Sequence, residues 1–196
     1  MTTANKITIC RILLIPLFVW LMLDYIRQYN SGEDREWERG IACVIFATAA
    51  ISDGIDGYIA RRYHQKTELG TFLDPLADKA LLVSAMVLLS VRYHGGTPFE
   101  MLPLWFPVLV ISRDLILLAG TVLIHMITGR VTARPRLVGK CATFFQMIAL
   151  GWVMLRLQPA PHEWPVYTAS FFTFVSGIWY IFDGIKQLNA HEATKA

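Results

Sequence analysis

Six apolar runs, each about long enough to cross a lipid bilayer, restrict the fold of this chain more than any other feature. The runs cover residues 7–26, 40–61, 71–91, 101–127, 137–155 and 166–185. About 20 mostly apolar residues cross the hydrocarbon layer as a helix, and a helix satisfies its own backbone hydrogen bonds there. We therefore predict an all-α integral membrane protein, in which six transmembrane helices form one membrane domain over residues 1–196.

Composition agrees with this class and excludes several others. Apolar residues make up 55% of the chain and charged residues 17%, whereas a typical soluble domain has about 45–50% and about 25%. Disordered proteins have few apolar residues and a high net charge, so this composition excludes a disordered protein. Its net charge of +3 is too small to indicate a nucleic-acid-binding surface. We expect membrane lipids around the protein and no nucleic-acid partner.

The distribution of Lys and Arg predicts how the helices are oriented. With six spans, both termini share one side of the membrane with the connections after the second and fourth spans. That side carries ten basic residues, and the other side carries five: Arg27, Arg35, Arg39, Arg92 and Arg156. Because the more basic side faces the cytoplasm, we predict cytoplasmic termini. No long targeting extension precedes the first run, so we expect a bacterial-type cytoplasmic (inner) membrane.

A strongly charged stretch, residues 33–39, separates the first two runs on the opposite side. It contains four acidic residues and two arginines around Trp37. We interpret it as a solvated loop, with Trp37 near the membrane interface.

Four aspartates interrupt the second and third apolar runs. Asp53 and Asp56 are spaced i,i+3, and Asp74 and Asp78 are spaced i,i+4, so each pair shares one face of its helix. Each Asp at bilayer depth costs about 2.5–3.5 kcal/mol, which indicates compensating positive charge. The short connection makes the two helices antiparallel neighbours, so the four carboxylates are expected to converge at the cytoplasmic end of the bundle.

The chemistry of these carboxylates favours a metal site. Four carboxylates in one place cannot all ionise without cations, and oxygen ligands without His or Cys select a hard divalent ion, Mg²⁺ or Mn²⁺. Two such ions form a common clamp for displacement at phosphorus. The alternative is that the aspartates form ion pairs at a helical corner, with the basic residues Arg61, Arg62, Lys66 and Lys79.

At these residues the sequence resembles the CDP-alcohol phosphotransferase family. The family's motif is Asp, two residues, Asp-Gly, two residues, Ala-Arg, a variable stretch, Gly, three residues, Asp, three residues, Asp. All eight fixed positions match: Asp53, Asp56, Gly57, Ala60, Arg61, Gly70, Asp74 and Asp78. Residues 5–11 look like the start of the first helix in bacterial members. The resemblance implies a six-helix membrane enzyme, often a homodimer, that moves a phosphatidyl group from CDP-diacylglycerol to an alcohol and releases CMP.

The resemblance also implies roles for these residues. Asp53, Asp56 and Asp74 would be metal ligands, and Asp78 would complete the metal shell and act as the base. Gly57, Ala60, Arg61 and Gly70 would contact the cytidine and the diphosphate.

Which alcohol accepts the phosphatidyl group stays open. Arg113 within the fourth run, with Arg134, Arg136 and Lys140 after it, could hold a phosphorylated acceptor. The alternatives are a positive-inside loop and a structural pair of Arg113 with Asp114. Overall likeness to the phosphatidylglycerophosphate synthases of the family implies glycerol 3-phosphate. Many of these carry Arg-Glu in the fourth helix, however, whereas Ser112-Arg113-Asp114 looks more like the family's cardiolipin synthases, whose acceptor is phosphatidylglycerol.

Charged residues inside membrane spans occur in transporters as well as in enzymes. Carboxylates inside a membrane also mark ion paths, so a divalent-cation or proton-coupled transporter is a remote alternative. A carrier, however, places its charges near the bilayer midplane, often in repeated halves.

Arg11 is one of few charges in the first run. It either approaches the substrate phosphate or extends to the membrane interface.

Overall fold

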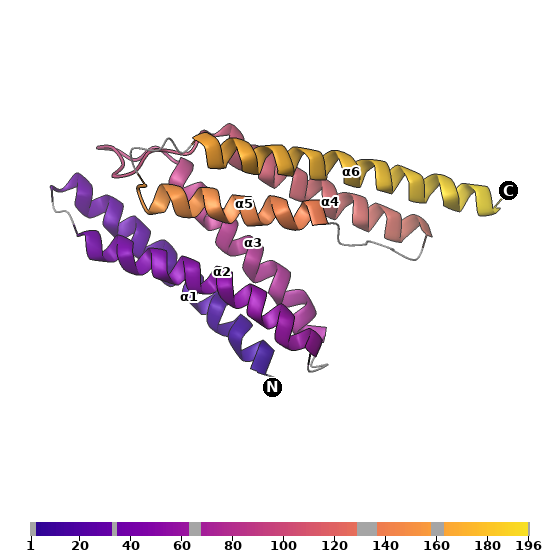
Figure 1. Ribbon diagram of the computed structural model, residues 1–196, viewed down its shortest axis with the longest axis horizontal. Helices are drawn as coiled ribbons and strands as arrows, with labels where there is room; N and C mark the ends of the chain where they lie inside the picture. The colour runs from indigo at the N-terminus through magenta and orange to yellow at the C-terminus, as the bar shows by residue number, and fades with distance from the viewer. Residues whose placement is uncertain (1–2, 33–34, 63–67, 129–136, 158–162, 196) are drawn as a thin grey trace. The chain divides into compact units, whose positions relative to one another are not determined.

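Six helices make up the described part of the chain in a computed structural model of the protein. The structure describes residues 3–32, 35–62, 68–128, 137–157 and 163–195, and side chains within 8–32, 35–52, 76–124, 126–127, 137–157 and 163–187. The helices are α1 (Thr3–Asn30), α2 (Glu36–Arg62), α3 (Glu68–Ser90), α4 (Trp105–Thr128), α5 (Leu137–Met154) and α6 (Glu163–Lys195) (Figure 1). The described residues contain no strand, which confirms the all-α prediction.

Each predicted apolar run coincides with one helix, although the bounds of run and helix are not identical. The run 101–127 begins before its helix, because α4 starts at Trp105. Proline disfavours helical backbone in the residue before it, and Pro103 follows Leu102, whose N–H donates to the Leu89 carbonyl at the end of α3 instead (3.0 Å). Residues 101–104 therefore form part of a connection.

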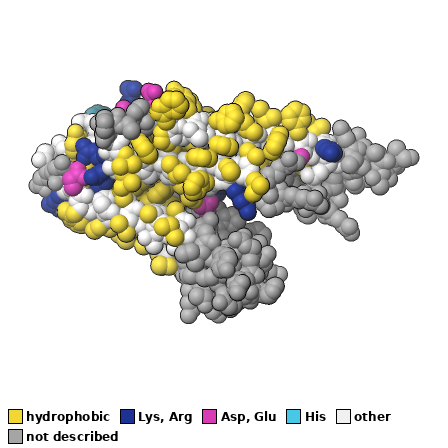
Figure 2. Space-filling view, viewed as in Figure 1, with side chains coloured by type: hydrophobic (Ala, Val, Ile, Leu, Met, Phe, Trp, Pro, Cys, Tyr) yellow, Lys and Arg dark blue, Asp and Glu magenta, His cyan; other side chains and the backbone are white. Residues whose placement is uncertain are grey.

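Within the described residues, four of the helices contain stretches long and apolar enough to cross a membrane. These stretches are Thr8–Asn30, Trp105–Ile124, Leu137–Met154 and Glu163–Gln187. Many of their large apolar side chains are exposed, among them Leu13, Trp20, Leu118 and Phe171, and Figure 2 shows such side chains covering much of the visible described surface. A protein in water does not leave this much apolar surface uncovered, so the chain is an integral membrane protein.

The chain divides into two compact units, and the first consists of Met1–Leu102 with Leu150–Ala160. In this unit α1 packs against both α2 and α3. Its apolar core includes Phe18, Met22, Leu82 and Met86, which are all fully buried. The rings of Phe18 and Phe46 lie 5.9 Å apart between centroids, which fixes how α1 and α2 face each other.

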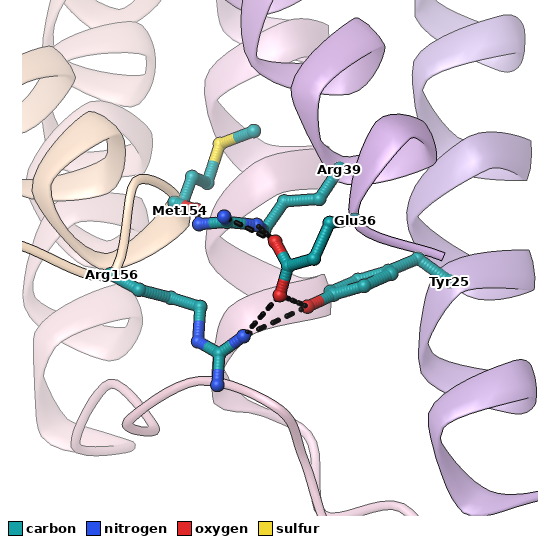
Figure 3. Close-up of polar contacts among 5 residues, drawn as sticks. All are labelled: Tyr25, Glu36, Arg39, Met154 and Arg156. Carbon is teal, nitrogen blue, oxygen red and sulfur yellow. Dashed lines mark hydrogen bonds and ion pairs between the residues drawn. The ribbon is translucent and has the colours of Figure 1, made fainter. Parts of the chain in front are cut away.

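Part of the stretch predicted as a solvated loop, residues 33–39, is the start of α2, and it carries a polar cluster (Figure 3). Arg156 Nη1 and Tyr25 Oη donate to Glu36 Oε1 at 2.7 and 3.4 Å. Arg39 Nε donates to Glu36 Oε2 (2.7 Å), and Arg39 Nη1 donates to the Met154 carbonyl (3.3 Å) at the end of α5. Acidic residues are favoured at the start of a helix and basic groups at its end. The cluster thus joins the end of α5 to the α1–α2 hairpin.

Removing the charge at Glu36 should weaken this cluster measurably. Glu36 and Arg156 are 45% and 35% exposed, so solvent screening limits their coupling to about 0.5–1 kcal/mol. We expect Glu36→Gln and Arg156→Gln each to lower the melting temperature in detergent by about 1–4 °C. The double variant should melt close to the less stable single variant. A double variant whose loss equals the sum of the two single losses would show that the pair is not coupled.

The second unit consists of Pro103–Ala149 with Pro161–Ala196. Within it α4 packs against α6. Between α5 and α6, the rings of Phe145 and Phe172 stack with their centroids 4.9 Å apart, and Gln146 Nε2 donates to Thr173 Oγ1 (2.8 Å) in a buried position. Hydrogen bonds of this kind join helices inside a membrane. The single domain expected over residues 1–196 stays a prediction.

Candidate active site

The predicted metal ligands lie on two helices of the first unit. Positions 53 and 56 are in α2, and positions 74 and 78 are in α3. The side chain of Asp78 is described and is half-buried. The side chains of the other predicted ligands and substrate contacts of this region lie outside the described residues: Asp53, Asp56, Gly57, Ala60, Arg61, Gly70 and Asp74.

The buried face of α2 runs toward the two aspartate positions. Ala42, Phe46 and Ala49 are buried, and they are spaced three or four residues apart, as residues on one helical face are. The same spacing continues from Ala49 to positions 53 and 56. Because α2 remains helical to Arg62, helical periodicity assigns both positions to the face of α2 that begins with these buried residues.

The same reasoning applies to α3 in the reverse direction. Ala85, Leu82 and Leu81 are buried, and Asp78 precedes Ala85 by seven residues, about two helical turns. Asp78 therefore lies on the buried face of α3, and position 74 follows one turn earlier. Among the side chains that the structure describes, no three His, Cys, Asp or Glu residues are grouped, since Asp78 alone of the four aspartates is among them.

The donor chemistry of this region fits divalent metal ions. The four aspartates offer eight carboxylate oxygens, and no His or Cys occurs between positions 52 and 63 or between 68 and 80. Oxygen donors of this kind suit Mg²⁺ or Mn²⁺ and are poor ligands for softer metals.

Arg113, a predicted acceptor ligand, lies in the second unit. It is 9% exposed, and its guanidinium donates from Nη1 to Asp114 Oδ1 (2.8 Å) and from Nη2 to Ser176 Oγ (2.6 Å). The guanidinium also lies over the Tyr180 ring, 5.5 Å from its centroid. The predicted pair with Asp114 is therefore present, and α6 supplies two further contacts.

One hydrogen-bond donor of Arg113 remains available. Its Nε is buried and has no hydrogen-bond partner among the described residues. A β-carbon at Gly139 would stand 3.1 Å from Arg113 Nη2 and 3.2 Å from Tyr180 Oη, so the absence of a side chain there leaves room for the guanidinium. A buried donor without a partner is unusual and is suited to an anionic ligand.

The remaining predicted acceptor ligands are only partly described. Lys140 is exposed in the first turn of α5, next to Gly139. Arg134 and Arg136 lie outside the described residues. Ser176, Tyr180 and Gly139 were not among the predicted site residues. Only the glycine carries a sequence signal, as a small residue that lets another group approach closely.

Comparison with known proteins identifies the family. The family model for CDP-alcohol phosphatidyltransferase matches residues 1–181. This chain belongs to the CDP-alcohol phosphatidyltransferase family. It is therefore a transferase enzyme, and enzymes of this family generally depend on a divalent metal. Membership favours a phosphatidyltransferase over the transporter considered as an alternative.

Bacterial relatives cover nearly the whole of this CDP-alcohol phosphatidyltransferase. A protein of Escherichia coli strain K12 named CDP-diacylglycerol–glycerol-3-phosphate 3-phosphatidyltransferase is 31% identical over 191 residues, which are 95% of this chain and 93% of the relative. Proteins of the same name from Escherichia coli O157:H7 and Shigella sonnei strain Ss046 match to the same extent.

Proposed function

We propose that this enzyme transfers the phosphatidyl group of CDP-diacylglycerol to glycerol 3-phosphate and releases CMP, which makes it a phosphatidylglycerophosphate synthase. The observation that carries this proposal is the likeness, over 95% of the chain, to bacterial enzymes whose names state that reaction. The complete eight-position motif, from Asp53 to Asp78, supplies residues suited to the chemistry.

We assign the metal and nucleotide contacts to the helices α2 and α3. Asp53, Asp56, Asp74 and Asp78 would hold two divalent ions, Mg²⁺ or Mn²⁺, and Gly57, Ala60, Arg61 and Gly70 would contact the cytidine and the diphosphate. When bound, the ions supply positive charge against the diphosphate. The support for this assignment is that helical periodicity extends the buried faces of α2 and α3 to the aspartate positions.

In the proposed reaction Asp78 is the general base. The hydroxyl oxygen of the acceptor attacks the phosphorus that carries the diacylglycerol group, and Asp78 accepts the hydroxyl proton. A new phosphorus–oxygen bond forms, the bond from this phosphorus to the CMP oxygen breaks, and CMP leaves with the electron pair. The half-buried position of Asp78 on α3 suits a group that must meet substrate and remain oriented by its helix.

Arg113 is the described residue best suited to hold the phosphate of the acceptor, with Arg134, Arg136 and Lys140 as further cationic contacts. Its Nε–H, which has no hydrogen-bond partner among the described residues, and its two amino groups form a donor set that Asp114 and Ser176 hold in place. A preoriented guanidinium binds phosphate strongly. Because Arg113-Asp114 resembles the sequence of the family's cardiolipin synthases, a cardiolipin synthase with phosphatidylglycerol as acceptor is the second candidate.

For the membrane arrangement, we propose six transmembrane helices in a bacterial inner membrane, with both termini and the active site on the cytoplasmic side. The distribution of basic residues supports this orientation, and the four apolar stretches agree with it. We also propose a homodimer, on the resemblance to family members, and light scattering of the detergent-solubilised protein would measure its mass.

The acceptor is tested by CMP release from CDP-diacylglycerol by the purified, detergent-solubilised protein. Glycerol 3-phosphate, phosphatidylglycerol, serine and inositol phosphate are offered separately, each with Mg²⁺, with Mn²⁺ and with EDTA. We expect release with glycerol 3-phosphate and metal, and none with EDTA. Release with phosphatidylglycerol alone would identify a cardiolipin synthase, and no release with any acceptor would refute the proposed reaction.

A further inference from the structure

Arg11 is fully buried although it lies in an apolar, membrane-spanning helix. It is 2% exposed, and it is among the largest side chains of the described residues that are buried to this extent. Thr8, Ile15 and Phe18 are buried with it at helical spacing, so Arg11 belongs to the face of α1 that packs against α2 and α3. A side chain extending to the interface would be exposed, so the structure excludes that reading.

The register of the α1–α2 hairpin relates Arg11 to a predicted metal ligand. The rings of Phe18 and Phe46 contact each other across the hairpin in a tilted arrangement, with their planes at 39°. In a pair of antiparallel helices, a residue that lies n positions before a contact in one helix is level with the residue n positions after that contact in the other. Arg11 lies seven residues before Phe18, and Asp53 lies seven residues after Phe46. Seven residues are about two turns, so positions 11 and 53 fall at the same level and on the same faces as the two rings.

The far end of the hairpin agrees with this register. Gln28 Nε2 donates to Glu38 Oε1 (3.1 Å), which pairs the end of α1 with the start of α2. At the other end, Figure 1 shows the start of α1 near the ends of α2 and α3 that carry the four aspartate positions. The buried faces of α1, α2 and α3 therefore bring one arginine and four aspartate positions to the same end of the first unit.

Charge explains why an arginine occurs at this place. A guanidinium stays protonated in proteins, and a buried charge is strongly destabilising unless opposite charge compensates it. Four aspartates at one end of a helical unit require positive charge nearby when metal ions are absent. Arg11 and the four aspartates at one end of the unit would each supply the opposite charge that the other requires.

We propose that Arg11 is a positioning residue of the metal site, whose buried positive charge holds the carboxylates of α2 and α3 together when metal is absent and moderates their affinity for divalent ions when it is present. This inference rests on the proposed function, which assigns the aspartates to the metal ions. Arg11 itself is not assigned a contact with the substrate.

The test compares thermal stability of the full-length protein in detergent with EDTA and with saturating Mn²⁺. For Arg11→Met we expect a lower melting temperature in EDTA and a larger rise on adding Mn²⁺ than for the wild type. The Mn²⁺ concentration that gives half of the rise should fall about ten-fold, because one nearby positive charge no longer opposes the ions. Arg11→Lys keeps the charge and should restore both quantities toward the wild-type values.

A matched control separates the effect of losing the charge of Arg11 from the effect of losing its buried volume. Phe18→Leu removes buried volume from the same face of α1 two turns away, and it should lower the melting temperature equally with EDTA and with Mn²⁺. If Arg11→Met behaves in this way, Arg11 is only a packing residue and the proposal is wrong. If Arg11→Met cannot be recovered folded, Arg11→Gln makes the same comparison against Arg11→Lys.

Two further results would overturn the inference for different reasons. An increased KM for CDP-diacylglycerol in Arg11→Gln, with an unchanged response to Mn²⁺, would make Arg11 a substrate ligand. A wild-type protein that Mn²⁺ and Mg²⁺ neither stabilise nor activate would contradict the metal assignment itself, whatever the Arg11 variants do. The wild-type measurement therefore distinguishes failure of the proposed function from failure of this inference.

Discussion

Asp78→Asn is expected to reduce CMP release by about 10²–10⁴-fold, the usual contribution of a general base. Asparagine has nearly the same shape as aspartate but cannot accept the hydroxyl proton, and it is a weaker metal ligand. Asp78 lies on α3 between the buried residue Ala77 and the half-buried Lys79, so a substitution of the same shape should leave the helix in place. The initial rate of CMP release, with glycerol 3-phosphate and metal at saturation, measures the effect.

The same substitution at a distant aspartate provides the control. Asp24 lies in α1, away from the four aspartate positions, and accepts a hydrogen bond from Gln28 Nε2 (2.8 Å). Asp24→Asn keeps an acceptor oxygen there, and we expect it to retain the wild-type rate. A rate in Asp78→Asn within a few-fold of the wild type, with the protein folded, would rule out Asp78 as the base.

The helices could be predicted from the sequence because the membrane requires them. Each long apolar run corresponds to a helix, but an apolar run marks where lipid surrounds the chain and does not mark where the helix ends. Thus α6 extends from Glu163 to Lys195, beyond the run 166–185, because polar residues at both ends continue the same helix. At α4 the opposite occurs, since Pro103 keeps the start of its run out of the helix.

Long-range polar contacts could not be predicted in the same way. Glu36 and Arg156 are 120 residues apart in sequence, and neither residue has a local pattern that indicates the other. The charge pattern around Glu36 predicts a solvated loop, but acidic residues such as Glu36 and Glu38 are also typical of the first turn of a helix, which is where the structure has them. The contacts of Arg113 with Ser176 and Tyr180 likewise depend on how α4 packs against α6.

The family and its aspartates were accessible from sequence for a different reason. The chemistry requires carboxylates at fixed spacing on two adjacent helices, so a short local pattern carries the information. The family match over residues 1–181 confirms this identification. The assignment of individual ligands stays a prediction, since the side chains at positions 53, 56 and 74 lie outside the described residues.

Arg113→Gln is expected to raise the KM for glycerol 3-phosphate by about 10–100-fold, with a much smaller change in the KM for CDP-diacylglycerol. Hydrogen bonds to a charged group contribute about 1.5–3 kcal/mol, and the substitution removes the charge, the Nε donor and the contact over Tyr180. Measuring the KM values for both substrates at saturating metal shows which of the two Arg113 helps to bind.

A structural role for Arg113 predicts a different set of results. Ser176→Ala removes the hydrogen bond from Arg113 Nη2 but leaves the charge and the pair with Asp114, so it should raise the KM for glycerol 3-phosphate only a few-fold. Arg113→Lys keeps the charge but loses the planar donor set, and its KM should lie between those of Ser176→Ala and Arg113→Gln. If Arg113→Gln instead lowers the melting temperature and leaves both KM values unchanged, Arg113 serves to join α4 to α6, and the acceptor phosphate binds elsewhere.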